Sequence, residues 1–217
     1  MKVRGIAAGA VAACAVAWGA VRFRRWHLRW GATDEEVASS LPGDEMCERP
    51  NFAFTRAITI RARPDEIWPW LVQIGFGKAG WYAYDWLDNR GRHSAEEVIP
   101  ELQHLEVGDW VPMDFSGRPP TGTTANRVKA FEPNRWLLWE HQGAPWVWVL
   151  RPIDEETTRL ISRGRQRYSW GRAILPVELV LMEIGDPFMM RKMMLNVKRR
   201  AEKLARARRT TVAGAAA

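Results

Sequence analysis

The residues best placed to do chemistry lie in one ten-residue run, Gly80–Asn89, which holds four aromatic side chains, two aspartates and an asparagine. Aromatic side chains at this density bury a large apolar area, and a buried Tyr or Trp usually keeps its polar atom hydrogen-bonded. Burial in such surroundings raises the pKa of a carboxyl group, which is the property a general acid or base needs. Asp85 and Asp88 are therefore the candidate acids, although a helix cap or a paired structural acid is the more ordinary role for each.

Metal and nucleotide sites are not supported by the spacing of the residues that could form them. The histidines His27, His93, His104 and His141 have neither the i, i+4 spacing nor the neighbouring carboxylates of a metal site. The run Gly75–Gly80 reads G-x-G-x-x-G, but a dinucleotide loop needs a strand before it and a helix after it. Here a predicted helix precedes the run and the aromatic segment follows. We expect a turn at the mouth of a cavity, with no metal and no cofactor.

Charge is distributed unevenly along the chain. Residues 1–30 carry six Lys/Arg and no acid, and residues 191–217 carry nine Lys/Arg and one acid, so a chain of net charge +7 has an acidic middle of −7. A nucleic-acid binder would carry positive charge on its folded face, so no nucleic-acid partner is expected. Two basic ends favour an anionic membrane surface as a partner. For the second end, a solvated helix terminus that complements its own dipole is the alternative.

The N-terminal segment has the pattern of a membrane anchor. Gly5–Val21 is a run of 17 residues without a charge, and as a helix it would be about 26 Å long, slightly short of a ~30 Å hydrocarbon core. Trp18, Trp26 and Trp30 lie where interfacial anchors would lie. Because more arginines follow the run than precede it, we expect a single-pass helix of the inner membrane with the C-terminal domain in the cytoplasm.

Two processing signals compete with the anchor. Ala15–Ala17 resembles a signal-peptidase site, and Val11–Cys14 resembles a lipobox. Cleavage at the first would leave a start rich in arginine, and the apolar run continues past the cysteine of the second. An uncleaved anchor is therefore the interpretation we adopt.

The remaining pattern is that of one α+β domain. Phe54–Arg61 alternates as a half-buried strand, and Pro64–Ile74 begins with proline and acids and continues at helical spacing. Later strand-like runs separated by turns indicate an antiparallel meander: Arg127–Phe131, Trp136–His141, Trp146–Arg151 and Thr158–Tyr168. Gly185-Asp186-Pro187 then predicts the start of a long helix, with Asp186 as the N-cap.

Two faces of the predicted elements could bind a ligand. Thr158–Tyr168 places four arginines on one face, typical of a solvated strand face, with an anionic-ligand site as the alternative. Trp146 and Trp148 share what we take to be the inner face of the sheet. Methionines near the start of the last helix form a soft, adaptable surface, which either fills the core or lines a pocket.

The run Gly80–Asn89, the strand and helix before it and the methionine-rich last helix together resemble the SRPBCC superfamily of START-like proteins, and its membrane-associated bacterial branch in particular. The resemblance implies a helix-grip fold, in which a curved antiparallel sheet surrounds a long C-terminal helix, preceded here by a transmembrane helix. The expected divisions are an anchor (1–30), a linker with a short helix (31–53), the START-like domain (54–207) and a disordered tail (208–217).

The resemblance also implies a pocket between the sheet and the last helix. The expected function is a membrane-tethered domain that binds a hydrophobic or amphipathic small molecule, such as a lipid, isoprenoid or polyketide-like compound. The expected ligand-binding residues are Trp81, Tyr84, Asp85, Trp86, Trp148, Met189 and Met193. One alternative is an aromatase/cyclase- or dehydratase-like enzyme with Asp85 as its acid or base. A membrane-recruited protein-interaction module is the other.

Overall fold

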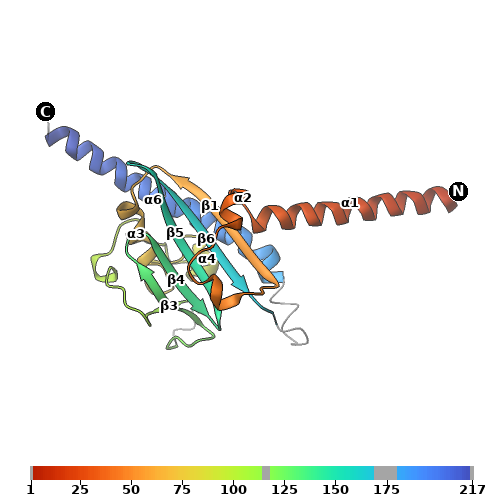
Figure 1. Cartoon of the computed structure of the whole chain (residues 1–217), viewed down its shortest axis with the longest axis horizontal. Helices are drawn as coiled ribbons and strands as arrows, with labels where there is room; N and C mark the ends of the chain where they lie inside the picture. The colour runs from red at the N-terminus through yellow and green to blue at the C-terminus, as the bar shows by residue number, and fades with distance from the viewer. Residues whose placement is uncertain (1, 114–117, 169–179, 216–217) are drawn as a thin grey trace.

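A computed structural model describes residues 2–113, 118–168 and 180–215 as a curved six-stranded sheet packed against a long C-terminal helix. The helices and helical turns are α1 (Lys2–Leu28), α2 (Asp34–Ala38), η1 (Asp44–Cys47), α3 (Pro64–Val72), α4 (Asp85–Asp88), η2 (Pro100–Leu102), η3 (Leu181–Gly185) and α6 (Asp186–Ala215). The strands are β1 (Phe52–Ile60), β2 (Trp110–Pro112), β3 (Ala125–Glu132), β4 (Trp136–His141), β5 (Ala144–Asp154) and β6 (Thr157–Gln166). This arrangement is the expected α+β helix-grip fold (Figure 1).

The sheet is antiparallel throughout, with the order β1-β6-β5-β4-β3-β2. Strands β3 to β6 form the predicted meander, and β2 extends it by one strand that was not predicted. Strand β1 pairs along its whole length with β6, so that Phe52 lies opposite Gln166 and Ile60 opposite Thr158. The first strand of the chain therefore lies beside the last. In this register the apolar side chains of both strands, which alternate with polar ones, lie on the same face of the sheet.

Helices α2 and α3 begin where capping residues in the sequence predict a helix start. Thr33 accepts the Glu36 backbone N–H, and Glu36 accepts the Thr33 N–H in return, which makes a capping box before α2. Helix α3 begins at Pro64, and Glu66 accepts the Arg63 N–H. The long C-terminal helix does not begin as predicted. A π-helical turn, η3, runs directly into α6, so Asp186 lies within a continuous helical run and its carboxylate binds Arg56.

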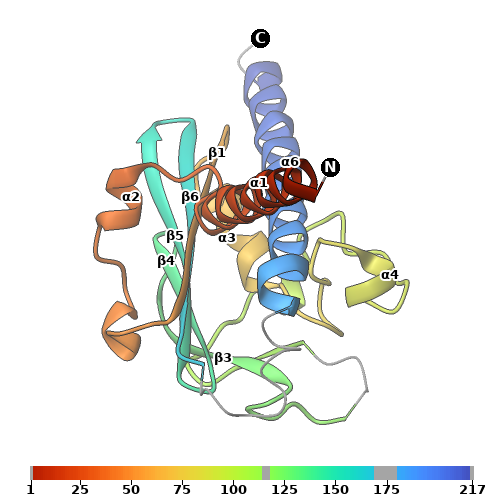
Figure 2. The same ribbon diagram turned by 90° about the vertical axis from the view of Figure 1, so that its right-hand side faces the viewer.

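The inner face of the sheet packs on α3, α6 and the segment around α4 (Figure 2). Buried residues of α6 recur every three or four positions, so a single stripe of the helix faces the core: Met190, Met193, Met194, Val197, Ala201 and Ala205. Trp148 and Leu160 meet this stripe from the sheet and are fully buried. Trp146 and Trp148 therefore lie on the inner face, as predicted.

The outer face of the sheet is covered by residues 29–49, which we call the N-terminal strap (Figure 2). Arg163 is 6% exposed and donates to Asp44 at 2.7 Å and to the strap carbonyls of Glu36 and Ser39. Arg159 binds the Glu36 carboxylate at 2.6 Å. The interpretation of the arginine face as solvated is therefore wrong. The partners of these arginines lie in the strap, more than a hundred residues earlier in the chain. The alternation of side chains within one strand carries no information about such distant partners.

Apolar contacts complete this outer layer. Leu41 and Met46 of the strap pack on Leu138, Val147 and Ile161. A glycine is required at one close approach, because Gly31 has φ +70° and a Cβ there would lie 2.1 Å from the Ala57 carbonyl oxygen. Burial alone would raise the pKa of Glu36, but the bonds from Arg159 and Thr33 outweigh it and hold that pKa below its ordinary value. The strap is thus an integral layer of the domain, although we expected a linker there.

Helix α1 projects from the domain and is attached by its last turns (Figure 1). Phe23 stacks on Phe188, and Arg24 and buried His27 bind Glu183. The transmembrane helix expected over Gly5–Val21 is not found. In the portion of the chain that the structure covers, no helix is long and apolar enough to cross a membrane. Eight of the 17 residues of that run are alanine and three are glycine, which keeps its apolarity low.

The basic C-terminal half of α6 packs against the acidic body. Arg200 and Arg199 bind Glu96, and Arg208 binds Glu66 and Glu156. Helix α6 continues to Ala215, so the segment 208–217, expected to be disordered, is helical as far as it is described. Much of the positive charge at this end of the chain therefore neutralises carboxylates of the same domain.

Candidate functional site

The candidate site is an apolar pocket of about 270 Å³ between the sheet and the start of α6. We call it the methionine pocket. Its lining residues come from the aromatic segment, the end of β2, β5 and the η3–α6 helical run: Trp81, Ala83, Asp88, Met113, Trp146, Met182, Gly185, Asp186, Met189, Met190 and Met193. Methionine has three rotatable side-chain bonds and a polarizable sulfur, so a surface rich in it adapts to ligands of different shape.

Tryptophans form a rigid wall of the methionine pocket. The Trp81 and Trp146 rings are stacked with centroids 6.2 Å apart, and both meet Trp139 edge-on. Trp146 Nε1 donates to Ser162, and Trp81 Nε1 donates to the Pro112 carbonyl. Because both indoles are fixed by hydrogen bonds, one wall is rigid while the methionine side is compliant.

The aromatic segment that carries Trp81 and Ala83 is fixed through Tyr82. This residue has φ +56°, which is rare outside glycine, and it is 1% exposed. Its hydroxyl accepts from Gln73 at 2.9 Å and its carbonyl accepts from Asn196 of α6 at 2.7 Å. Burial raises the pKa of Tyr82 far above its usual range. Tyr82 therefore works as a neutral anchor, and its two neighbours line the pocket.

Asp88 places a carboxylate in the wall of this apolar pocket. It is 8% exposed, and its Oδ2 accepts the Tyr84 backbone N–H at 3.0 Å. Its Oδ1 is buried and, within the described part of the chain, has no hydrogen-bond partner. Burial raises the pKa of Asp88, the charge of Asp85 adds to the shift, and the Tyr84 bond and the charge of Lys192 oppose it.

Asp186 is the second carboxylate of the lining, and it is neutralised by a buried arginine. Arg56 is 1% exposed and donates to Asp186 at 2.7 Å and to the His27 carbonyl at 2.7 Å. Burial raises the pKa of Asp186, against the opposing charge of Arg56. Burial also lowers the pKa of His27, although its bond to Glu183 acts in the other direction. The attached end of α1 and the pocket thus share one network of polar groups.

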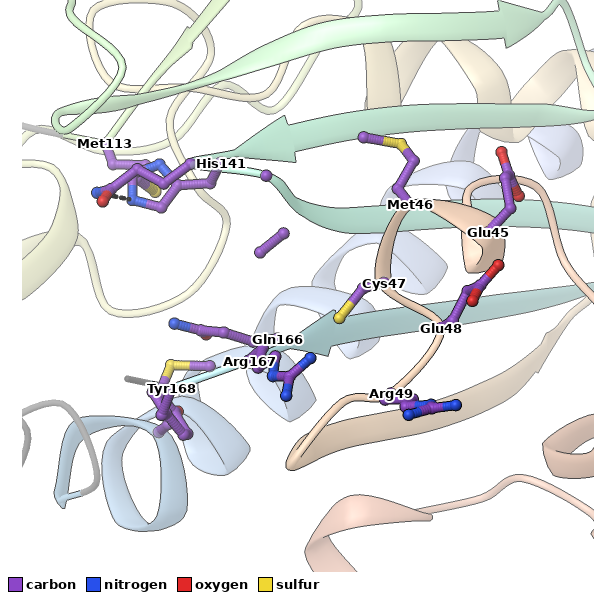
Figure 3. Close-up of a pocket in the computed structure, with 14 residues that line it drawn as sticks. Glu45, Met46, Cys47, Glu48, Arg49, Met113, His141, Gln166, Arg167 and Tyr168 are labelled. Carbon is purple, nitrogen blue, oxygen red and sulfur yellow. Dashed lines mark hydrogen bonds between the residues drawn. The ribbon is translucent and has the colours of Figure 1, made fainter. Parts of the chain in front are cut away.

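Two further hollows extend from the methionine pocket. The adjoining hollow, about 210 Å³, shares Met113, Trp146, Met182 and Asp186 with it and continues along the inner face past Asn126. The strand-end hollow, about 990 Å³, is larger and shares Met113 and Met182 (Figure 3). Its labelled side chains include several charged ones: Glu45, Glu48, Arg49 and Arg167. We take the smaller methionine pocket as the site because its lining is apolar and ligand burial depends on apolar contact.

The structure brings three of the seven predicted ligand residues into the methionine pocket: Trp81, Met189 and Met193. Trp148 lies behind the lining, with its ring 5.3 Å from that of Trp146.

The other three predicted ligand residues lie outside the methionine pocket. Tyr84 packs beneath the Lys192 ammonium at 3.9 Å. Asp85 accepts from Ser94 at 2.6 Å, and its carboxylate helps hold the segment through that serine, which also accepts the Tyr82 N–H. Trp86 is 74% exposed. Asp85 and Trp86 line a polar hollow on the opposite side of the aromatic segment.

Several lining residues were not predicted as ligand residues. Two of them were singled out from the sequence for other reasons, Asp88 as a candidate acid and Trp146 as a residue of the inner face. Met190 and Met182 belong to the same methionine cluster as Met189. Asp186 was interpreted as a helix N-cap, so it was not considered as a lining residue.

The chemistry available here is apolar binding together with one uncompensated carboxyl group. Over residues 2–113, 118–168 and 180–215, no group of three or more His, Cys, Asp or Glu side chains is placed to hold a metal ion. The run Gly75–Gly80 forms a closed turn bridged between its two ends, between α3 and the aromatic segment. It serves as the predicted turn.

No family model and no curated protein matches the chain. Among solved structures, the Aha1 dimer from Colwellia psychrerythraea is 14% identical over 70% of this chain and 96% of its own, with a TM-score of 0.40. The Polyketide_cyc-like protein Cgl2372 from Corynebacterium glutamicum is 20% identical over 74% and 87%, with a TM-score of 0.32. The di-domain ARO/CYC StfQ from the steffimycin biosynthetic pathway is 14% identical over 70% and 51%, with a TM-score of 0.39. At these identities and TM-scores the likenesses carry no ligand and no activity over to this chain.

Proposed function

We propose that this protein binds an apolar or amphipathic small molecule in the methionine pocket, with the ligand held between the sheet and α6. The observation that carries the proposal is the lining itself, in which five methionines and two tryptophans border the space: Met113, Met182, Met189, Met190, Met193, Trp81 and Trp146. The adjoining hollow lengthens the space available along the inner face.

Burial alone supplies enough free energy for modest affinity. At about 25 cal/mol per Å², removing roughly 300 Å² of apolar ligand surface from water yields about 7 kcal/mol. Association costs of similar size offset much of this gain, so polar contacts and the fixed tryptophan wall must supply the remainder. The rigid indoles lower the ordering cost, because they are already held by Ser162 and Pro112 before a ligand arrives.

Native mass spectrometry of the full chain, purified without detergent, tests the proposal directly. We expect a co-purifying small molecule, or uptake of the neutral dye Nile red, in a 1:1 ratio. Met189→Trp should fill the pocket and abolish uptake, whereas Leu195→Trp, on the exposed side of the same helix, should not. Equal uptake by the wild type and the Met189 variant would place the ligand elsewhere and refute the proposal.

An enzymatic function of the aromatase/cyclase type is the second candidate, and Asp88 is the observation in its favour. A buried carboxyl group with a raised pKa, in the wall of an apolar pocket, has the properties of a general acid or base. Asp88→Asn should then lower turnover of an enolisable aromatic polyketide by a factor of about 100 or more. Glu101→Gln serves as the control, because that exposed carboxylate lies outside the pocket lining.

We also propose that α1 attaches the domain to an anionic membrane surface. Val16, Trp18 and Val21 are more than half exposed on the projecting part of α1, and Arg22 and Arg25 lie beside them. Co-sedimentation with vesicles containing 30% anionic lipid should require residues 2–21. Binding that is indifferent to lipid charge, or that survives their removal, would contradict this part of the proposal.

A further inference from the structure

The unpartnered oxygen of Asp88 restricts the class of ligand. Buried polar atoms in proteins are nearly always hydrogen-bonded, and an unpaired one costs about 1–3 kcal/mol. Asp88 Oδ2 is satisfied by the Tyr84 N–H, but Oδ1 has no partner among the residues that the structure describes. The residue is more than nine-tenths buried and belongs to the pocket lining. A ligand group that donates a hydrogen bond would remove this cost.

The charges around the pocket point to the same kind of group. Asp88 and Asp186 are the two ionisable side chains among the described lining residues, and Arg56 already occupies an oxygen of Asp186. Asp85 adds negative potential at Asp88, and the nearby positive group, Lys192, packs over the ring of Tyr84. An anionic head group such as a fatty-acid carboxylate would meet two carboxylates and, among the lining residues that the structure describes, no cation. A hydroxyl or ammonium group would be attracted.

The donor can reach Asp88 only by local rearrangement. Oδ1 has less than 1 Å² of exposed surface, so a neighbouring side chain must turn aside when the ligand enters. Methionine side chains change rotamer at low cost, and Met189, Met190 and Met193 line the same pocket. The tryptophan wall need not move.

We propose that the methionine pocket selects an apolar small molecule bearing a hydrogen-bond donor, a hydroxyl or an ammonium group, which donates to Asp88 Oδ1, and that it excludes carboxylates. This inference rests on the proposed binding function. The apolar body of the ligand lies against the methionines and Trp146, and its donor group lies at the wall formed by the aromatic segment. A donor bonded to a charged acceptor is worth about tenfold or more in affinity.

The test compares four probes with a linear eight-carbon chain on the full-length wild type by displacement of Nile red: octylammonium, 1-octanol, octyl methyl ether and octanoate. We expect octylammonium and octanol to bind about tenfold more tightly than the ether, and octanoate to bind most weakly. Asp88→Asn turns an amide N–H toward the pocket, because its oxygen still accepts from Tyr84. This variant should lose about tenfold for octylammonium while keeping its affinity for the ether.

The outcomes separate the two proposals. If the ether or octanoate binds the wild type as tightly as the donors, the pocket binds apolar molecules without this selectivity, and the inference is overturned while the proposed function stands. If no probe binds, the proposed function itself fails. Ether binding by Asp88→Asn reports that the variant is folded, and loss of octylammonium binding in Met189→Trp shows that the probe occupies this pocket. The ranking of probes on the wild type decides the matter even without the variant.

Discussion

The two faces of the sheet are both covered, but by opposite kinds of interaction. On the inner face, tryptophans and methionines pack mainly through apolar contacts and leave a pocket of about 270 Å³. On the outer face, Arg159 and Arg163 bind carboxylates and carbonyls of the strap at distances near 2.7 Å. The outer layer is fixed by directed contacts, and the inner layer keeps space that can be filled.

The difference shows where this fold is specified and where it is adaptable. A buried charge network is costly unless every member is paired, so it tolerates one arrangement only. Apolar packing tolerates exchange of side chains of similar volume. We therefore expect changes on the outer face to affect folding, and changes on the inner face to affect the ligand first.

Removing the strap should have the largest effect. A chain beginning at residue 51 loses the partners of Arg159 and Arg163 and exposes the apolar outer cluster around Leu138 and Val147. Each broken buried pair costs about 3–5 kcal/mol, and the stability of a whole domain is about 5–15 kcal/mol. We expect no cooperative unfolding transition by circular dichroism. A chain beginning at residue 22, which keeps the attached turns of α1 and the strap, is the control and should unfold cooperatively.

Arg163→Ala should destabilise the intact chain by about 3 kcal/mol, the lower end of the cost of breaking a buried pair, because it removes the donor to the Ser39 carbonyl and one of the donors to Asp44 and to the Glu36 carbonyl. Urea unfolding measures this loss. Arg135→Ala removes an exposed pair with Glu132 and should cause no measurable change. If the two variants lose similar stability, the outer face is not held by directed contacts.

Met193→Leu, on the inner face, should change stability by at most about 1.5 kcal/mol, since volume and apolarity are conserved. Its effect on Nile red affinity should exceed that of Met46→Leu, which makes the same exchange in the strap, on the outer face of the sheet. Fluorescence titration of both variants gives the comparison. Equal effects on the dye would show that the two faces do not differ in ligand contact.

Asp88→Asn should have the smallest effect on stability, and it should stabilise the protein where the other substitutions destabilise it. Burial raises the pKa of Asp88, so the folded protein binds this proton more tightly than the unfolded chain. Wild-type stability should therefore fall as pH rises from about 4, the ordinary carboxyl range, toward neutrality. The variant lacks this decline and should be more stable at pH 8 by about 1 kcal/mol, the lower end of the cost of an unpaired buried group. Urea midpoints measured from pH 4 to pH 8 provide the check, and a variant less stable at pH 8 would contradict it.

Local patterns predicted the elements well because they depend on neighbours in the sequence. β4 has the predicted bounds Trp136–His141, and α3 begins at the predicted Pro64. Partners distant in sequence were not predictable. Strand alternation separated the arginine face of β6 from its apolar face, but nothing local indicated that Asp44 would cover Arg163.

The candidate site was predicted in part for the same reason. Helical spacing correctly grouped Met189 and Met193. The short turn of α4, however, directs Trp86 outward and Asp88 inward, and the aromatic run alone does not distinguish the two directions.

The pairing of β1 with β6 also orders events during synthesis. The ribosome releases Phe52 long before Gln166, its partner across the sheet, and α6 follows later still. Until then, the tryptophan-rich inner face of the nascent chain has no helix to cover it, and the edge of β1 has no strand beside it. Such surfaces attract chaperones or other nascent chains. Translation speed and chaperone supply should therefore govern the yield of this protein more than its final stability does.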